Sequence, residues 1–571
     1  MPPPTRTTRK WKSPRRKLDL EAELCSQLGI SSLTAATLVA RGMTAPETAA
    51  KFLSPAADQL HDPRLLPDAL SAVSHIMHAK ENDHPIYVHG DYDVDGVTSA
   101  AIWTRTLRRL GFKVIPHVPH RIKEGYGIHV DAVQQAANAG AKLFLTCDCG
   151  SSAHASIEAA KELGMTVVVT DHHELPEKLP AAEAIVNPHR KDSEYPFKSL
   201  SGAGVAFKIA QLVSEECGAS LELFHRAFLD LACLGTIADV VPLVDENRVI
   251  ASLGLKQLSN TKKAGLRALI STSGIGNGKP ITSFDVGWRL GPRLNAAGRI
   301  ADAEESLSLL LTEDAIEANG IAAQLEVHNS ERKTEQDRIL EHAEEIIKDR
   351  SFFSDPLIFI SAPEWHVGVI GIVAGRLAER YYRPVLVASE NEDTGIAKGS
   401  ARSIPGFNLF EALRANGELF EAFGGHERAA GFSINAARIE EAREQLIQYA
   451  DGHLTQEVLT PTIIADAEIG VEEVNLATVE ELQKLEPFGE ANPVPRFIMN
   501  RARVANASPT KNPEHAQFEI ESQSVLRGIA FKIGNDLMKT HFPADLNLLV
   551  ELNVDEWNGY KRVNVQLKDF N

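Results

Sequence analysis

The chain has 571 residues, of which 43% are hydrophobic and 24% are charged, and it carries a formal net charge of −18. This composition is typical of a globular protein with about three or four domains of roughly 150 residues each, and no apolar run is long enough to span a membrane. The five cysteines lack framework spacing, which excludes a small disulfide scaffold and favours a reducing compartment such as the cytoplasm.

The charge is distributed unevenly along the chain. Residues 1–17 contain seven Lys or Arg and no acid, and their prolines and lack of an apolar stretch argue against a secretory signal. We predict a disordered basic tail there, with a transit peptide as the weaker alternative. The remainder is strongly acidic, so any binding of a polyanion requires a local concentration of basic residues. Residues 18–80 are polar and are predicted to form a helical N-terminal segment.

From the first strand to about residue 190, apolar runs alternate with helical patterns, which predicts an α/β domain with a buried parallel sheet, and we place the bounds of this domain at residues 81–303. Three of the predicted strands end in side chains that bind metal ions: 86–90 before Asp91, Asp93 and Asp95, 143–146 before Asp148, and 167–170 before Asp171, His172 and His173. Open parallel sheets build their sites at the carboxyl ends of the strands. One crevice is therefore predicted to collect these ligands, and their joint occurrence indicates a divalent metal site.

Each motif taken alone has a simpler interpretation. The sequence from Asp91 to Gly96 opens like an EF-hand calcium loop, but Ile102 occupies the twelfth position, where that loop needs glutamate. Asp171 with the two following histidines is also typical of a helix N-cap with surface histidines. Cys147 and Cys149 suggest a zinc thiolate site, yet strand alternation turns them away from Asp148, so we expect ordinary core cysteines.

The rest of the chain predicts three further parts. Residues 226–241 form an apolar helix that delivers Asp239, either a simple helix-end acid or a fourth carboxylate of the site. Residues 304–352 are rich in Ala, Glu, Leu and Gln and predict a connecting helix. A second α/β unit follows at 353–452, and 460–571 ends in an alternating hairpin around Asn558-Gly559, which indicates a small β-domain.

In their order and spacing, these motifs resemble the DHH phosphoesterase superfamily. Motifs of the second unit resemble the DHH-associated domain: residues 365–371 (WHVGVIG), residues 400–403 (SARS) and residues 424–426 (GGH). Residues 291–299 (GPRLNAAGR) resemble the RecJ exonuclease subgroup, and the C-terminal β-domain resembles an OB-fold. The resemblance covers residues 60 to 571 and implies a DHH domain, a long helix, a DHH-associated domain and an OB-fold-like barrel that binds single strands.

The resemblance implies two Mn²⁺ or Mg²⁺ ions and a catalytic set around them. The implied metal ligands are Asp91, Asp93, Asp95, Asp148, His172 and Asp239, with Asp148 bridging, and His173 is counted with the catalytic residues. Within that set Asp91 matches a supporting position of the motif, as do His89 and His173. Hard oxygen ligands with one or two imidazoles suit these metals better than a thiolate site would.

The resemblance also implies a phosphate clamp across the cleft, near the 5′ end of the nucleic acid. Its candidate residues are Arg121, Arg293, Asn295, Arg299, Arg402, Ser403, Gly424, Gly425 and His426. Guanidinium suits bidentate phosphate contacts, and glycine allows close approach of the backbone. Without the resemblance, the arginines would be interpreted as surface salt bridges and the two glycines as a turn. Among the C-terminal aromatics, Phe518, Phe531, Trp557 and Tyr560 are available for base stacking, with no individual roles assigned.

The implied function is a single-strand-specific 5′-to-3′ DNA exonuclease of recombination and repair, using two metal ions. The alternatives are a DHH hydrolase of pyrophosphate, short oligonucleotides or cyclic dinucleotides, and an inactive single-strand-binding protein. The complete carboxylate set argues against the inactive protein, and the extra β-domain argues against small substrates. The family further implies a cytoplasmic monomer that works with a helicase and a single-strand DNA-binding protein, away from membranes.

Overall fold

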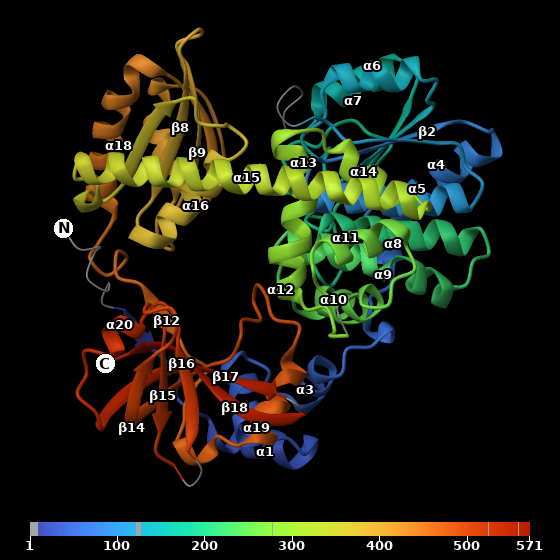
Figure 1. The fold of residues 1–571 in the computed structure, drawn as a ribbon. Helices are drawn as coiled ribbons and strands as arrows, with labels where there is room; N and C mark the ends of the chain where they lie inside the picture. Colours follow the sequence, from blue (N-terminus) through green and yellow to red (C-terminus); the bar gives the residue numbers. More distant parts are fainter. Residues whose placement is uncertain (1–8, 121–126, 277, 523–524, 558) are drawn as a thin grey trace.

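The computed structural model describes residues 9–120, 127–276, 278–522, 525–557 and 559–571, and Figure 1 shows their arrangement. Two α/β lobes lie at the two ends of the long helix α15 (Ala315–Asp349), and the C-terminal barrel lies below them with the first helices of the chain beside it. Among the described residues, none of the helices combines the length and apolarity that crossing a bilayer requires.

The first lobe contains a parallel sheet in the strand order β3-β2-β4-β5-β6. Its strands are β2 (Ile86–Gly90), β3 (Val114–His117), β4 (Leu143–Cys147), β5 (Thr166–Thr170) and β6 (Ala184–Val186). The central strands β2 and β4 are buried along their whole length, as expected for apolar runs covered on both faces. The predicted α/β fold with a parallel sheet is confirmed.

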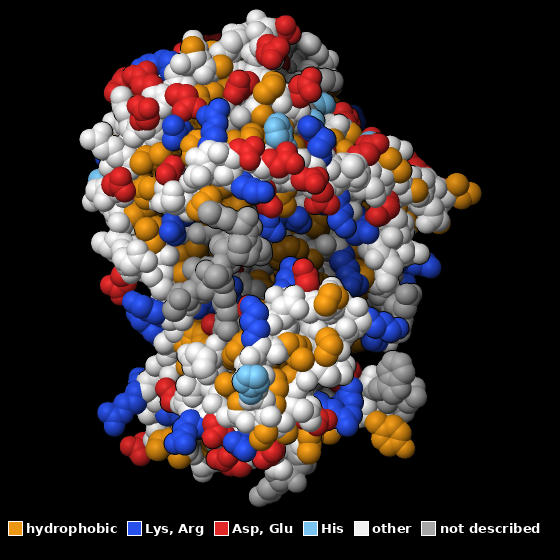
Figure 2. Space-filling model, turned by 60° about the vertical axis from the view of Figure 1, so that its left-hand side comes forward, with side chains coloured by type: hydrophobic (Ala, Val, Ile, Leu, Met, Phe, Trp, Pro, Cys, Tyr) orange, Lys and Arg blue, Asp and Glu red, His pale blue; other side chains and the backbone are white. Residues whose placement is uncertain are grey.

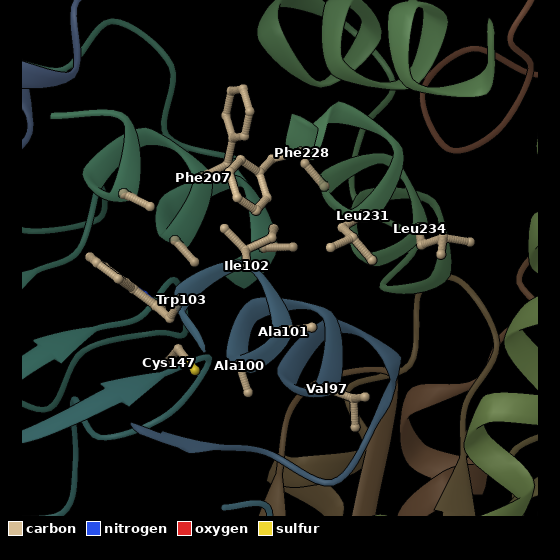
Figure 3. Packing of buried hydrophobic residues seen from close by; sticks show 14 of the residues in the cluster. Val97, Ala100, Ala101, Ile102, Trp103, Cys147, Phe207, Phe228, Leu231 and Leu234 are labelled. Carbon is tan, nitrogen blue, oxygen red and sulfur yellow. The ribbon is translucent and has the colours of Figure 1, made fainter. Parts of the chain in front are cut away.

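Helices surround this sheet and extend the first lobe. They are α4 (Ala69–Glu81), α5 (Val94–Arg109), α6 (Val130–Asn138), α7 (His154–Glu162), α8 (Gly202–Glu216), α9 (Leu221–Ala238), α10 (Asp245–Leu258), α11 (Ala264–Thr272), α12 (Ser283–Asp285), α13 (Gly291–Ile300) and α14 (Glu304–Leu311). Figure 3 shows how α5 packs against α8 and α9, with Ile102, Phe207 and Leu231 between them. This core fixes both ends of α5, which matters because its first turn carries aspartates of the predicted site.

The predicted connecting segment 304–352 consists of two helices. α14 contributes Leu307 and Leu310 to the core of the first lobe, and α15 then begins at Asp314, whose side chain caps it by accepting from Ile316 N and Glu317 N. The far half of α15 contributes Ile339 to the core of the second lobe. A single helix therefore connects the two α/β lobes.

The second lobe is a mixed sheet in the order β10-β11-β9-β8-β7, in which β7 and β8 are parallel. Its elements are β7 (Ile358–Pro363), α16 (Ile370–Tyr381), β8 (Val385–Asn391), β9 (Ile396–Arg402), α17 (Leu409–Ala415), β10 (Phe420–Gly425), β11 (Ala429–Asn435) and α18 (Ile439–His453). The core residues of this sheet, such as Phe359 and Phe432, are buried.

The C-terminal part is a closed barrel in the order β14-β15-β16-β18-β17, with β17 pairing back to β14. Its elements are β12 (Thr462–Ile464), β13 (Ala467–Glu468), α19 (Leu476–Leu482), β14 (Arg496–Pro509), β15 (Ala516–Ile520), β16 (Leu526–Ala530), α20 (Gly534–Leu537), β17 (Ala544–Trp557) and β18 (Tyr560–Phe570). The predicted barrel is confirmed. β17 and β18 form the predicted hairpin, although Asn558 of its turn lies outside the described residues.

The N-terminal segment 18–80 is helical but is shared between two cores. α1 (Leu18–Leu28), α2 (Ser32–Ala40) and α3 (Pro46–Leu53) bury Leu24 and Leu33 with barrel residues such as Phe497, whereas α4 belongs to the first lobe. The buried Arg248 of α10 holds these parts together by donating to the backbone oxygens of Phe52 and Leu485. Barrel and first lobe are thereby docked on each other.

The prediction of a disordered tail at residues 1–17 is wrong for its second half. Residues 1–8 lie outside the described residues, but β1 (Lys10–Lys12) pairs in parallel with β12. Trp11 explains this order, because it packs against the barrel and its Nε1 donates to Asp569 Oδ2 at 2.8 Å. Together with the strand pairing and the contact of Arg16 with Glu473, this apolar residue anchors a basic segment to the barrel part of the chain.

Candidate metal centre and phosphate groove

The carboxyl edge of the parallel sheet collects the predicted metal ligands. Since β2, β4 and β5 are neighbours, the residues that follow them meet at one place. Ligand atoms lie within 4.8 Å of one another in three overlapping sets: Asp91, Asp93 and Asp148; Asp95, His172 and Asp239; and Asp148, His172 and His173. Asp148 and His172 each belong to two of these sets, so the three sets form one continuous cluster of possible metal ligands.

The start of α5 positions two of the aspartates. Asp93 is the N-cap of this helix and accepts from Asp95 N at 2.9 Å and from Gly96 N at 3.1 Å. Asp95 accepts from Gly202 N at 2.6 Å and from Ala203 N at 2.9 Å, which are the first amides of α8. A helix N-terminus stabilises a carboxylate, so Asp95 is held in one orientation by a second element.

Two close approaches allow Asp148 and Asp95 to be buried. Asp148 has a left-handed backbone, with φ of 62°, and a Cβ on Gly202 would lie 2.5 Å from its Oδ1. A Cβ on Gly235 of α9 would lie 2.4 Å from Asp95 Oδ1. Both positions therefore require glycine, because any side chain would push against a carboxylate of the site.

His172 lies at the centre of the cluster. Its Nε2 is 3.0 Å from Asp148 Oδ1, 3.6 Å from Asp239 Oδ2 and 3.7 Å from Asp95 Oδ2. The ring also makes a hydrogen bond to the Leu200 backbone. Such a second contact fixes the orientation of a metal-binding imidazole.

His173 and Asp171 form a supporting pair beside the ligands. Asp171 is buried and accepts from His173 Nδ1 at 2.8 Å and from Ser151 N at 2.9 Å. Burial lowers the pKa of His173, but the hydrogen bond and charge of Asp171 outweigh it and raise this pKa to about 9. The same pairing outweighs burial for Asp171 and holds its pKa well below the ordinary value.

The electrostatics of the carboxylates call for a cation. Burial and then the neighbouring carboxylates raise the pKa of Asp95 to about 7 and that of Asp239 to about 9, and they raise the pKa of Asp148 well above its ordinary value. Burial lowers the pKa of His172 to about 4, so this ring is neutral and able to act as a ligand. Without a cation, the carboxyl groups of the centre resist ionisation. A divalent ion stabilises their ionised forms and so removes the repulsion between them.

The donor set fits Mn²⁺ or Mg²⁺. Asp148 Oδ1 and His172 Nε2 are both buried and make no hydrogen bond in the structure. Oxygen donors with one imidazole are typical of these ions. Cys147 and Cys149 do not join them, because both are buried in the hydrophobic cores and their Sγ atoms face the His89 backbone oxygen at 3.7 and 3.9 Å. His89 is itself buried beside Phe144, and burial lowers its pKa to about 3.

A groove of about 610 Å³ in the second lobe collects part of the predicted phosphate clamp. Arg299 of α13 lines it together with Arg402 of β9 and Gly424 of β10, so the groove lies where the two lobes meet. Arg299 Nη1 donates to Gly368 O at 3.0 Å, which connects α13 to the loop before α16. Figure 2 shows Lys and Arg side chains around the hollowed middle of one face, while Asp and Glu gather above it.

The other predicted clamp residues that the structure describes are not among the residues that line this groove. Arg293 pairs with Glu326 of α15 and donates to Arg289 O, and Asn295 is half-buried on α13. The Ser403 hydroxyl donates to Phe407 O at 2.7 Å. Gly425 and His426 are exposed at the end of β10, where Gly425 has φ of 142°, and Arg121 lies outside the described residues.

An exposed aromatic pair that the sequence patterns did not predict lies just before α13, in the segment between the metal centre and the barrel. Phe284 and Trp288 are 59% and 71% exposed, and their ring centroids are stacked 6.1 Å apart. Trp288 lies in a π-helical segment, Val286–Leu290, directly before α13. π-Helical segments often mark functional sites.

The aromatic pair is connected both to the metal centre and to the barrel side. A Cβ on Gly298 of α13 would lie 3.0 Å from Tyr92 O in the aspartate loop, and one on Gly291 would lie 3.7 Å from Ala238 Cβ, next to Asp239. Ser283 Oγ donates to Phe488 O at 2.6 Å, just before the barrel. The segment with the exposed rings therefore lies between the two.

The C-terminal aromatics divide into core and surface. Phe518 is buried in the barrel, whereas Phe531 and Tyr560 are exposed. The side chain of Trp557 lies outside the described residues.

Profiles of three protein families match the chain. The DHH family, N-terminal domain, matches residues 85–236, the DHHA1 domain matches residues 354–452, and the RecJ OB domain matches residues 465–569. These three matches follow the two lobes and the barrel described above.

Curated relatives and solved structures agree with these matches. The single-stranded-DNA-specific exonuclease RecJ of Bacillus subtilis is 38% identical over 98% of this chain and 70% of that protein, and the RecJ of Escherichia coli is 34% identical over 86% and 88%. The crystal structure of RecJ in complex with Mn²⁺ from Thermus thermophilus is 30% identical, with a TM-score of 0.83 over 98% of this chain and 79% of that one. A second structure of the same protein, in complex with Mg²⁺, has a TM-score of 0.78. The chain belongs to the RecJ family.

Proposed function

We propose that the chain is a metal-dependent, single-strand-specific DNA exonuclease that degrades from the 5′ end and acts in recombination and repair. The observation that carries this proposal is the joint position of a buried carboxylate and histidine cluster and a basic groove on the two sides of α13. One side suits divalent cations and the other suits phosphate. The relatives are named single-stranded-DNA-specific exonucleases, which supports the same substrate here.

The proposed ligands of two Mn²⁺ or Mg²⁺ ions are Asp91, Asp93, Asp95, Asp148, His172 and Asp239. When bound, such ions lower the pKa of a water, orient it for in-line attack on the phosphorus and stabilise the leaving oxygen. The protein keeps the ligand atoms in place through the α5 and α8 N-termini and through Gly202 and Gly235. His173, held by Asp171, is placed to donate a hydrogen bond to a phosphate oxygen.

The proposed path of the strand uses both sides of α13. Arg299 and Arg402 hold backbone phosphates in the groove, near the 5′ end. The Phe284–Trp288 pair stacks bases between the barrel and the metal centre, because exposed stacked rings suit unpaired bases and cannot reach bases within a duplex. Phe531 and Tyr560 are the exposed aromatics of the barrel that can serve the same purpose.

The test of this function is Mn²⁺-dependent digestion of a long oligonucleotide labelled at its 5′ or 3′ end, as a single strand and as a blunt duplex. We expect early release of 5′-labelled mononucleotide from the single strand only. Survival of the long strand together with hydrolysis of pyrophosphate or short oligonucleotides would instead support a small-substrate hydrolase. Binding without any hydrolysis would support an inactive single-strand-binding protein.

We further infer from the family that the protein acts in the cytoplasm as a monomer, with a helicase that supplies the strand and a single-strand DNA-binding protein that covers it. Sedimentation of the purified protein tests the oligomeric state directly.

A further inference from the structure

The first lobe contains a second basic cavity, far from the metal centre. Its volume is about 1020 Å³, and it lies between the C-terminal ends of α5, α10 and α14, the start of α11 and the first half of α9. α5 has 16 residues, so its two ends are about 24 Å apart. Asp95 lies in the first turn of this helix and Arg108 in the last, which separates the cavity from the proposed site of hydrolysis.

The lining of this cavity is strongly positive in a protein whose net charge is −18. Seven of the lining residues are basic and two are acidic: Arg105, Arg108, Arg109, Arg226, Lys256, Lys262 and Lys263 against Asp230 and Glu313. Like charges placed this closely repel each other in the absence of a counter-ion. The cavity therefore has a local charge opposite to that of the whole chain.

Both acidic residues are already neutralised within the structure. Lys263 Nζ donates to Asp230 Oδ1 at 2.7 Å, and Thr261 Oγ1 donates to its Oδ2 at 2.8 Å. Arg105 Nη1 contacts Glu313 Oε1 at 3.1 Å, and its Nε donates to Leu310 O at 2.7 Å. These contacts hold the walls of the cavity in place and leave the remaining basic residues without an acidic neighbour among its lining residues.

Five of the basic side chains make no ion pair and no side-chain hydrogen bond within the described part of the chain: Arg108, Arg109, Arg226, Lys256 and Lys262. Arg108, Arg109 and Lys256 lie in the last turns of α5 and α10, where the helix dipole favours cations. The dipole does not explain Lys262, because it lies just before the N-terminal end of α11, where the dipole disfavours cations, whereas Lys263 is paired with Asp230. A ligand anion explains Lys262 and is compatible with the cations at the two helix C-termini.

The shape and lining of the cavity indicate the class of ligand. Its volume is close to the upper limit of about 1,000 Å³ for small-molecule sites. Phe228 is the one aromatic residue among the lining residues, and it is only 5% exposed, so no ring is available for stacking a base. Recognition would then rest on closely spaced negative charges, which Arg and Lys bind as phosphate groups.

We propose that this cavity, lined by Arg108, Arg109, Arg226, Lys256 and Lys262, is a second site that binds a compact oligophosphate. The bound group is a chain of two or more linked phosphates, either free or as the polyphosphate end of a nucleotide. The phosphates lie among the five unpaired cations and the first amides of α11. No residue of the site belongs to the metal centre or to the groove at Arg402.

Titration calorimetry with inorganic tripolyphosphate tests the site. The ionic strength and the concentration of free Mg²⁺ are kept constant, because tripolyphosphate itself binds this metal. The test variant is R226Q/K262Q, and the matched control is K142Q/K191Q, which removes two exposed lysines elsewhere. The test variant loses two charge-assisted contacts to phosphate, so we expect it to bind at least about tenfold more weakly. The control should bind like the wild type. Equal binding by the test variant and the wild type would overturn the proposal.

Two further measurements distinguish a nucleotide from a free oligophosphate and separate this site from the proposed site of hydrolysis. If ATP binds as tightly as tripolyphosphate, the ligand is the polyphosphate end of a nucleotide. If ATP binds more weakly, the ligand is a free oligophosphate. Displacement of tripolyphosphate by oligo(dT) would overturn the proposal in favour of a nucleic-acid contact. Asp148→Asn should bind tripolyphosphate like the wild type, so failure of the nuclease function leaves this result intact.

Discussion

Asp148 Oδ1 and His172 Nε2 lie 3.0 Å apart on the buried side of the metal centre, and neither atom makes a hydrogen bond. Two buried polar atoms at this distance are costly unless a third partner contacts both. Each has a lone pair to offer, and each belongs to sets of atoms spaced for metal coordination. A cation between them is the simplest way to satisfy both.

Asp148→Asn should abolish cleavage while the fold persists. Removing one metal ligand costs several kcal/mol of transition-state stabilisation, so the rate should fall by at least about 100-fold. The metal-free variant should melt at a higher temperature than the metal-free wild type, because the amide that replaces the Asp148 carboxyl carries no charge and needs no extra proton to be buried among the other carboxylates, whereas the carboxyl has a raised pKa there. Digestion in Mn²⁺ and thermal unfolding in EDTA measure the two effects, with Asp192→Asn as an exposed control. A normal rate of cleavage would show that Asp148 is not a ligand.

The contribution of Asp95 and Asp239 to the stability of the metal-free protein should fall as the pH rises from about 4 to about 9. Burial and neighbouring carboxylates raise the pKa of Asp95 to about 7 and that of Asp239 to about 9, far above the ordinary value of about 3.9. In this range the folded state keeps protons that the unfolded state has released, so higher pH favours unfolding. Melting in EDTA across this range checks the slope, and Asp239→Asn should reduce it. If stability changes with pH by the same slope in the wild type and in Asp239→Asn, the raised pKa of Asp239 is not the cause of that slope.

Trp288→Ala should weaken binding of long single strands and leave hydrolysis of a dinucleotide unchanged. Stacking contributes about 1–3 kcal/mol per base, which corresponds to a loss in affinity of about 5- to 150-fold. Trp288→Phe should retain most of the binding, since it keeps a ring next to Phe284. Fluorescence anisotropy of labelled oligo(dT) and dinucleotide turnover give the two readouts. An equal loss of strand binding and of dinucleotide hydrolysis would mean that Trp288 stabilises the fold around α13 and does not contact the DNA strand.

Arg402→Ala should make the binding of single strands less dependent on salt. If the guanidinium contacts one phosphate, the slope of log K against log salt should fall by about 0.7. Arg414→Ala is a suitable control, because Arg414 pairs with Glu411 on the surface of α17. Affinities measured at several salt concentrations give both slopes. An unchanged slope would remove Arg402 from the phosphate clamp.

Lys208→Met should destabilise the fold without a specific effect on catalysis. Lys208 and Glu246 are fully buried and paired at 2.7 Å, and Tyr195 also donates to this carboxylate. Removing the cation leaves a buried charge without its partner, which costs about 3–5 kcal/mol. Lys208→Met/Glu246→Leu should recover part of this loss, and urea unfolding measures both variants. A double variant less stable than the single one would contradict this explanation.

The prediction of the site depended on apolar runs and on the residues that directly follow them, which can be seen in the sequence itself. Asp93, Asp148 and His172 each follow an apolar run, and parallel strands place such residues at one edge whatever the remainder of the fold does. Asp239 was less certain, because a helix-end acid has no periodic signal. Its position beside Asp95 depends on the packing of α9 against α5, in which Gly235 permits a close approach.

By itself, the sequence determined the strand-end ligands, the order of the domains and the family, because apolar periodicity and motif spacing are local properties. The tertiary structure alone decided that the α8 N-terminus holds Asp95, that Trp11 anchors the N-terminal segment to the barrel, and that Trp288 is exposed in the segment between the metal centre and the barrel. Each of these depends on contacts or solvent exposure created by packing between distant segments. Local sequence patterns do not indicate which distant surfaces come into contact, because these contacts form only when the buried faces pack together.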